Sequence, residues 1–277
     1  MTEYLNFEAD VNTLRFASAL DHTSLWSMAF GRLILENLDL KSNITGLDLG
    51  CGTGFPLLEL ANMHDRSCKF IGLDVWDSGL ARAQEKLSAY HLDNVSLIAL
   101  KDKTFPLDDN SIDLITANLV LNNLDNPDDT LAECYRVAKP HARIAITTNL
   151  DGHMQEFYTA FETVLRDTGH DNLMDVLNGH RARRGTVASH RALLERNGFK
   201  VQKQIDDTLT LRYLNGSAFL RHWFIKIAFL PSWKSLIPQD DQARFFQVLE
   251  AKLNTLSDKM GDLRLSVPIL YLEGIRQ

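Results

Sequence analysis

The sequence predicts a doubly wound α/β fold, a mostly parallel seven-stranded sheet with helices on both faces and a helical cap. Two observations predict it. Short apolar segments alternate with helical segments between residues 44 and 148, and such alternation is typical of parallel strands. A turn with three glycines, Leu47 to Gly54 (Leu-Asp-Leu-Gly-Cys-Gly-Thr-Gly), joins the first apolar segment to the first helix. A strand, a glycine turn and a helix N-terminus together form a nucleotide-sized cradle.

Composition limits the class of protein. The 277 residues are 45% hydrophobic and 23% charged, which is ordinary for a soluble globular protein with a sizeable core. We expect one domain over residues 1–277, with an N-terminal helical lid at 1–43, a ligand-binding core at 44–150 and a helical insertion or cap at 215–260. The net charge of −7 argues against a nucleic-acid partner held by overall phosphate attraction.

Cysteine usage and apolar segments bear on location. Cys51, Cys68 and Cys134 are far apart and odd in number, with neither zinc-ligand spacing nor a disulfide framework, so we expect no metal site. A reducing, cytoplasmic setting fits them best. The first residues lack the basic start and apolar run of a secretory signal. The most apolar stretch, 219–230, is short and contains charged residues, so no stable membrane insertion is expected.

The elements of the core can be placed in chain order. Residues 1–43 are mainly helical. The expected strands are 44–49, 69–74, 95–100, 111–117 and 141–148, and the expected helices between them are 55–64, 77–90 and 126–138. The last helix begins at Asn126-Pro127, a cap followed by a first-turn proline.

The regular alternation loosens after Asn149. Residues 154–167 and 186–196 are expected to be helices, the second ending at Asn197-Gly198. Three segments are strand-like, at 199–205, 209–213 and 263–275. Pro268 interrupts the last of them, which suits an edge strand or a bulge.

The glycine turn does not fit a phosphate-binding loop. A dehydrogenase fingerprint, Gly-x-Gly-x-x-Gly, that starts at Gly50 would need a third glycine where Phe55 stands. A P-loop needs Gly-Lys-Ser/Thr, but Gly54 is followed by Phe55 and Pro56. An acid followed by Gly-x-Gly-x-Gly suits a nucleoside that bears an amino acid.

This turn resembles the first cofactor motif of the class I S-adenosylmethionine-dependent methyltransferases, which have a Rossmann-like fold. The resemblance covers about residues 44 to 148 and is to the ubiquinone/menaquinone-biosynthesis type, whose members methylate small molecules. It implies S-adenosylmethionine as the cofactor. The loop residues that it implies for cofactor binding are Asp48, Gly50, Cys51, Gly52 and Gly54.

The later strand ends supply further cofactor candidates. Asp74 ends the second strand, where a carboxylate can accept hydrogen bonds from both ribose hydroxyls; the alternative is a cap for the next helix. Val75 could pack on the adenine. The resemblance implies an acid near the adenine amino group, before Phe105-Pro106-Leu107; we favour Asp102, with Lys101 occupying the expected place otherwise.

After the fourth strand, the resemblance implies that the backbone around Asn118 and Leu119 receives the methionine part of the cofactor. Asn122 is a substrate candidate, together with Asn123; both could instead only shape a turn. The sequence departs from the family here, with Asn-Asn in place of Arg-Asn. His141-Ala142 also stands where two glycines are usual.

Acceptor residues are less clearly marked. His153 is the candidate general base, with Glu156 and Tyr158 as substrate contacts, or it is a surface histidine at a helix start. The aromatic insertion containing Trp223 suits an apolar substrate, a dimer interface or plain packing.

Two more segments have open interpretations. Trp26, with Phe16 and Phe30, could line a lid over the cofactor or pack in the core, and His22 is a second candidate base beside Trp26. The basic run 180–184 could bind an anionic substrate group or form a solvated charged turn.

We therefore expect an enzyme that moves the methyl group of S-adenosylmethionine to a small, apolar molecule by in-line displacement, with oxygen or carbon as the favoured acceptor atom. Its expected partner is the small-molecule substrate, and the chain is expected to be a monomer or homodimer. The alternatives are a non-catalytic S-adenosylmethionine-binding or scaffold protein and, less favoured, an NAD-dependent oxidoreductase. A protein or nucleic-acid methyltransferase is also possible, although Asn118–Leu121 lacks the Asn-Pro-Pro-Tyr signature of many nucleic-acid enzymes.

Overall fold

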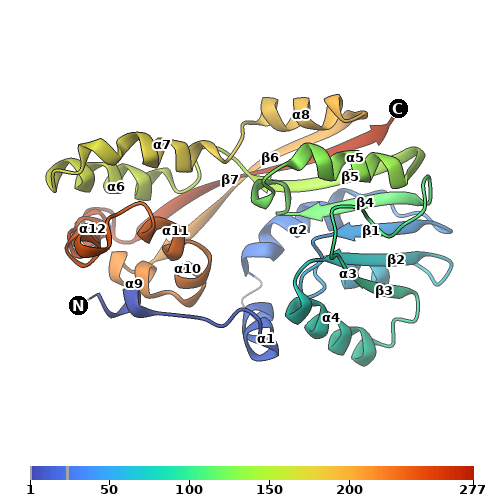
Figure 1. The fold of residues 1–277 in the computed structure, drawn as a ribbon, viewed down its shortest axis with the longest axis horizontal. Coiled ribbons are helices and arrows are strands. Elements are labelled where there is room, and N and C mark those ends of the chain that lie inside the picture. The colour runs from blue at the N-terminus through green and yellow to red at the C-terminus, as the bar shows by residue number, and fades with distance from the viewer. Residues whose placement is uncertain (1, 23–24) are drawn as a thin grey trace. The chain divides into compact units, whose positions relative to one another are not determined.

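The computed structural model describes residues 2–22 and 25–277, which form two compact units (Figure 1). We call the first the sheet unit; it comprises Asp10–Asn149, Gly185–Asp207 and Ile269–Gln277. We call the second the helical unit; it comprises the residues up to Ala9, Leu150–Arg184 and Thr208–Pro268. Each unit is described by itself.

A seven-stranded sheet organises the fold, as predicted. Its strands are β1 (Thr45–Leu49), β2 (Lys69–Asp74), β3 (Val95–Ala99), β4 (Ile112–Asn118), β5 (Ala138–Asn149), β6 (Phe199–Tyr213) and β7 (Leu263–Arg276). The strand order is β3-β2-β1-β4-β5-β7-β6. The first five pair in parallel, and β7 runs antiparallel to β5.

The strand order reverses direction at β1, which has β2 on one side and β4 on the other. Helices α3 (Leu57–Met63) and α4 (Asp77–Tyr90) connect the strands on the first side, and α5 (Pro127–Val137) connects β4 to β5. Right-handed crossovers that run in opposite directions place these helices on opposite faces of the sheet (Figure 1). The carboxyl ends of β1 and β4 therefore flank the crevice where such folds bind ligands.

The two C-terminal strands differ from the sequence prediction. β6 is continuous over residues expected to form two strand segments. β7 continues through Pro268 and has neighbours on both sides, so it is neither an edge strand nor interrupted there. Pro268 is tolerated because the β5 pairing begins one residue later, at Ile269, and the Pro268 carbonyl accepts a hydrogen bond from the Leu150 N–H.

Three further helices belong to the sheet unit: α1 (Leu14–His22), α2 (Leu25–Asn37) and α8 (Val187–Arg196). Asp21 at the end of α1 accepts hydrogen bonds from Thr53 in the glycine turn (3.0 Å) and from Lys86 of α4 (2.7 Å). α8 begins at a capping box formed by Thr186 and Ser189, close to the predicted start.

The helical unit is built around aromatic side chains. Its helices are α6 (Gln155–Asp167), α7 (Met174–Ala182), α9 (Gly216–Arg221), α10 (Trp223–Ala228), α11 (Leu230–Lys234) and α12 (Gln239–Met260). Its largest fully buried side chains include Phe157, Phe161, Phe219, Trp233, Phe245 and Phe246. The sequence did not predict α7. The basic run is therefore not simply a charged turn, because His180 and Arg181 lie in the last turn of this helix.

In the part of the chain that the structure describes, no helix is long and apolar enough to cross a membrane. Cys51, Cys68 and Cys134 are buried free thiols.

Candidate cofactor and acceptor sites

The glycine turn follows β1 directly and depends on glycine at a specific position. Gly50 has a φ of +67°, in the left-handed region that favours glycine. A Cβ there would also lie 2.6 Å from Val120 Cγ2, which is too close for any larger residue. Gly52 has a φ of +50° and no atom within 4 Å of where its Cβ would be, so the backbone faces open space.

Asp74, the last residue of β2, is held against this turn. Its Oδ2 accepts a hydrogen bond from the Gly52 N–H (2.7 Å), and its Oδ1 accepts one from the Trp76 N–H (2.8 Å). Helix α4 starts at Asp77 with Trp76 at its N-cap, so Asp74 does not cap that helix. The carboxylate is fixed in place, and each oxygen keeps a lone pair for a ligand.

A cavity of about 590 Å³ lies in the sheet unit at the carboxyl ends of β1 and β2. It brings together four of the predicted cofactor residues: Gly50, Asp74, Val75 and Asp102. Val75 is 73% exposed, which is unusual for a large apolar side chain and suits a ligand that packs on it.

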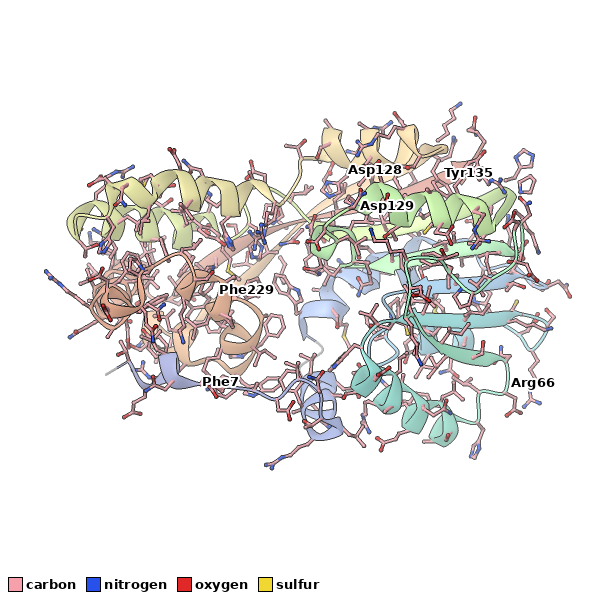
Figure 2. The ribbon with its side chains drawn as sticks, viewed as in Figure 1. Phe7, Arg66, Asp128, Asp129, Tyr135 and Phe229 are labelled. Carbon is pink, nitrogen blue, oxygen red and sulfur yellow. The ribbon has the colours of Figure 1, made fainter. Side chains whose placement is uncertain are left out.

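The charge of this cavity is predominantly negative. Its acidic side chains are Asp74, Asp102, Asp125 and Asp129, and its basic ones are Lys101 and Lys103. Asp129, labelled on α5 in Figure 2, pairs with Lys103 at 3.3 Å. The balance of charges favours a cationic ligand over one that carries phosphates.

Sequence reasoning missed the wall of the cavity formed by Leu124, Asp125, Asn126, Asp129 and Thr130. These residues follow β4 and begin α5. The polar side chains of 125–130, shortly after a predicted strand, are a usable signal, whereas Asn126-Pro127 by itself predicts only a helix start.

The side chains of Asp48 and Cys51 are buried and do not line the cavity. Asp48 is 1% exposed and accepts a hydrogen bond from the Thr116 hydroxyl (2.6 Å). Burial, with a contribution from the negative charge of Asp74, raises the pKa of Asp48 to about 7. Burial also raises the pKa of the Cys51 thiol well above its usual range, so this cysteine is not a thiolate nucleophile.

The segment after β4 is fixed by side-chain and backbone hydrogen bonds. Asn118 accepts one from the Thr147 hydroxyl (2.6 Å) and donates one to the Ser27 carbonyl of α2 (3.1 Å). Leu119 adopts a φ of +62°, and its N–H donates to the Thr147 carbonyl (3.0 Å). A non-glycine residue in this conformation is strained, and such strain is common at ligand sites.

Asn122 is engaged within the sheet unit. Its amide donates hydrogen bonds to the backbone carbonyl (2.7 Å) and to Oδ1 (2.8 Å) of Asn149. Its own Oδ1 lies 3.3 Å from His190 Nε2. These bonds favour the turn-shaping interpretation of Asn122.

The remaining candidates in the sheet unit are aromatic. Trp26 is partly exposed and contacts Phe30 with ring centroids 5.2 Å apart. Phe30 is fully buried, which favours the core interpretation over the lid for that residue. Phe16 contacts Trp76 edge-on at 6.3 Å.

The helical unit holds the candidates for acceptor chemistry. His153 is 3% exposed, and its ring lies 5.4 Å from that of Phe229, which Figure 2 labels. It is therefore not a surface histidine. Burial, together with the charges of Arg184 and His180, lowers the pKa of His153 well below its usual value, so the imidazole is neutral at neutral pH.

Three other candidates also lie in the helical unit. Tyr158 is buried. Trp223, the first residue of α10, is partly exposed. Glu156 accepts hydrogen bonds from the N–H (2.9 Å) and the hydroxyl (2.6 Å) of Ser266, so it joins α6 to β7.

A second cavity, of about 720 Å³, lies in the sheet unit at the amino ends of β1, β2 and β3. Its lining includes Thr45, Lys69 and Val95, the first residues of β1, β2 and β3. Ligands in doubly wound sheets bind beyond the carboxyl ends of the strands, so the smaller cavity is the better candidate.

The family of the chain follows from comparison with known proteins. A family model described as "Methyltransferase domain" matches residues 40–192, more than half of the chain. The chain therefore belongs to this methyltransferase domain family. The matched region contains the glycine turn, Asp74 at the end of β2, Asp102 after β3, and the segment after β4.

Individual relatives are similar over this same region. A demethylmenaquinone methyltransferase of Shouchella clausii (strain KSM-K16) is 34% identical over 110 residues, which cover 40% of this chain and 47% of the relative. A malonyl-[acyl-carrier protein] O-methyltransferase of Marinomonas sp. (strain MWYL1) is 33% identical over 136 residues, or 48% of this chain and 49% of the relative. The chain thus spans about half the length of the curated relatives it matches.

Among solved structures, a SAM dependent methyltransferase from Aquifex aeolicus is similar with a TM-score of 0.54 and 26% sequence identity. The similarity covers 72% of this chain and 93% of that one. The fold predicted from the glycine turn is therefore that of known methyltransferases.

Proposed function

We propose that this chain is an S-adenosylmethionine-dependent methyltransferase that acts on a small molecule. The observation that carries the proposal is the cavity at the carboxyl ends of β1 and β2, where Gly50 and Asp74 meet an exposed Val75. Membership of the methyltransferase domain family supports it.

The residues of the cavity fit this cofactor better than they fit a dinucleotide. S-adenosylmethionine carries a sulfonium and an ammonium group and no phosphate, which suits a lining with more acidic than basic side chains. A dinucleotide would place its pyrophosphate at the glycine turn and the helix N-terminus, beside this acidic lining. Phe55, in place of a third spaced glycine, also disfavours the dinucleotide.

Each residue has an assigned role in this proposal. Asp74 accepts hydrogen bonds from the ribose hydroxyls, Val75 packs on the adenine, and Asp102 accepts from the adenine amino group. The turn at Gly52 and the strained backbone at Leu119 face the methionine part. When bound, the cofactor supplies an electrophilic methyl group, and the protein orients the acceptor in line with it.

We infer that the acceptor is a small molecule with a large apolar part, methylated on oxygen or carbon. The aromatic composition of residues 219–233 supports this, as does the similarity to a demethylmenaquinone methyltransferase. In this proposal His153 is the general base for the acceptor's proton. Burial lowers the pKa of its imidazole and makes it a weak base, so it takes up the proton only as the methyl group is transferred. A His153→Ala variant is expected to lose turnover while keeping its affinity for the cofactor.

Calorimetric titration tests the cofactor assignment. The wild-type protein should bind S-adenosylmethionine and S-adenosylhomocysteine and not NADH. Asp74→Asn should weaken binding by about tenfold or more, because a charge-assisted hydrogen bond to the ribose is lost. Asp77→Asn, a matched change three residues on at an exposed helix start, should leave binding nearly unchanged.

The result against the proposal would be NADH binding without S-adenosylmethionine binding. Formation of S-adenosylhomocysteine with a panel of apolar phenols and quinols then separates an enzyme from a scaffold. Cofactor binding without turnover on any of them would favour the non-catalytic alternative.

We also propose that the chain works in the cytoplasm as a monomer or homodimer, without a nucleic-acid partner. The negative net charge and the three separate buried thiols support this. Light scattering after size-exclusion chromatography measures the oligomeric state directly.

A further inference from the structure

The basic run at the end of α7 contains two arginines that pair with no acidic side chain among the described residues, the exposed Arg183 and the half-buried Arg184. Arg181 pairs with Glu162 at 2.5 Å, and its guanidinium lies 5.6 Å from the centre of the Tyr158 ring. Arg184 lies 6.0 Å from the same ring centre and is half-buried. Among the residues that the structure describes, no acidic side chain pairs with Arg184.

Two acids of α6 form no ion pair with this arginine, because their carboxylate oxygens are engaged elsewhere. Glu156 accepts two hydrogen bonds from Ser266, and Glu162 holds Arg181. A half-buried guanidinium without a carboxylate partner is poorly solvated and attracts an anion.

A hydrogen-bonded chain beside this arginine adds a second donor. The Trp233 Nε1–H donates to the Tyr158 hydroxyl oxygen (3.2 Å), and that hydroxyl lies 3.1 Å from His180 Nε2. The Tyr158 oxygen already accepts a hydrogen bond from Trp233, so its O–H is the group that donates to His180 Nε2. The neutral His180 ring then carries its own proton on Nδ1. Within the described ranges, Nδ1 has no hydrogen-bond partner.

His180 is neutral at neutral pH. Burial, followed by the charges of Arg184 and Arg183, lowers the pKa of His180 to about 4. The site therefore offers the half-buried positive charge of Arg184, with the exposed charge of Arg183 beside it, and one neutral N–H donor, on His180. Neither Arg184 nor the Nδ1–H of His180 can accept a hydrogen bond. Two hydrogen-bond donors, one of them positively charged, favour an anionic ligand.

The surroundings of this pair are aromatic. Trp233 stacks on Phe157 with ring centroids 4.1 Å apart and on Phe229 at 5.7 Å. Tyr158 contacts Phe157 edge-on at 5.3 Å. These rings are buried, so they form an apolar layer behind the two donors, and the low dielectric of that layer strengthens the attraction of Arg184 for an anion.

We propose that Arg184 and His180 bind the carboxylate of a ligand whose remaining part is apolar or aromatic. The inference rests on the proposed function only in taking this ligand to be the methyl acceptor. The sequence predicted an apolar acceptor, and this inference adds a carboxylate to it, so that the expected acceptor is amphipathic.

The test uses the full-length protein and two probes of equal shape, naphthoate and its neutral counterpart naphthamide. Binding is followed by calorimetry and by quenching of tryptophan fluorescence. The wild-type protein should bind naphthoate at least about tenfold more tightly than naphthamide, and Arg184→Gln should remove that preference. Arg183→Gln is the matched control, because Arg183 is the exposed neighbour in the same run.

Equal affinity for the two probes, no binding of naphthoate up to about 5 mM, or an unchanged preference in Arg184→Gln would each overturn the proposal. Thermal unfolding of Arg184→Gln confirms that the variant is folded. Titration of the same protein with S-adenosylmethionine separates the two proposals. Naphthoate selectivity without cofactor binding would contradict the methyltransferase function alone, and the converse would contradict the carboxylate site alone.

Discussion

The sheet unit and the helical unit present ligand-facing groups in different ways. In the sheet unit the backbone positions the groups. Gly50 has a left-handed φ, and Asp74 is held by the N–H groups of Gly52 in the glycine turn and of Trp76. In the helical unit the groups are side chains brought together from distant helices, as Tyr158, His180 and Trp233 are. A site that is positioned by the backbone of one turn can be recognised from a short sequence motif. A site whose side chains come from helices far apart in the sequence has no such motif, because it depends on tertiary packing.

The largest effect that can break this comparison is expected at Gly50. Gly50→Ala imposes a left-handed alanine and a close contact with Val120, so we expect S-adenosylmethionine affinity to fall about a hundredfold or more. Calorimetry measures the loss. Gly169→Ala is the control: its φ is +75°, but nothing lies within 4 Å of its Cβ position. If both variants kept wild-type affinity, the backbone of the turn would not govern the site.

A smaller effect is expected at Tyr158, where the helical unit depends on side chains. Tyr158→Phe leaves the buried Trp233 Nε1–H without its acceptor, which should lower the free energy of unfolding by about 1–3 kcal/mol. Chemical denaturation measures this. Tyr135→Phe removes an exposed hydroxyl that donates to the Gln277 carbonyl and should cost under about 0.5 kcal/mol. Equal losses of stability in the two variants would show that the hydrogen bonds of Tyr158 with Trp233 and His180 do not stabilise the helical unit.

A third effect depends on pH and concerns Asp48 in the sheet unit. Its pKa of about 7 in the folded protein lies above the ~4 of an unfolded chain. Protonation therefore stabilises the fold at low pH, and this contribution is lost as the pH rises from about 4 through 7. Between pH ~5 and pH ~8, the free energy of unfolding of Asp48→Asn should increase by about 1 kcal/mol or more relative to that of the wild type. A stability difference that stays constant across this range would contradict the assignment.

The sequence predicted the sheet unit closely because its signals are local. Strand β1 begins one residue from its expected start, and α5 begins at the proline that marked it. Local signals predicted Gly50, Asp74 and Val75, and the family resemblance implied Asp102. The structure brings these four residues to one cavity. That these residues hold a cofactor stays a prediction.

The rest could not be predicted because long-range pairing decides it. Strand β6 is largely exposed and carries many charges, so only its place beside β7 makes it one continuous strand. The proline in β7 suggested an edge, but the position of the β5 pairing made it harmless. His153 was expected at the surface or in catalysis, and its burial against Phe229 is invisible in the sequence.

The central claim is that the cavity at the carboxyl ends of β1 and β2 holds the cofactor. Hydrogen–deuterium exchange with and without S-adenosylhomocysteine tests it most directly. We predict new protection in peptides that cover residues 47–54, 74–76 and 100–105, and none in peptides 64–70 and 90–96 beside the second cavity, near Arg66 in Figure 2. Protection confined to the second cavity, or absent from the glycine turn, would contradict the account.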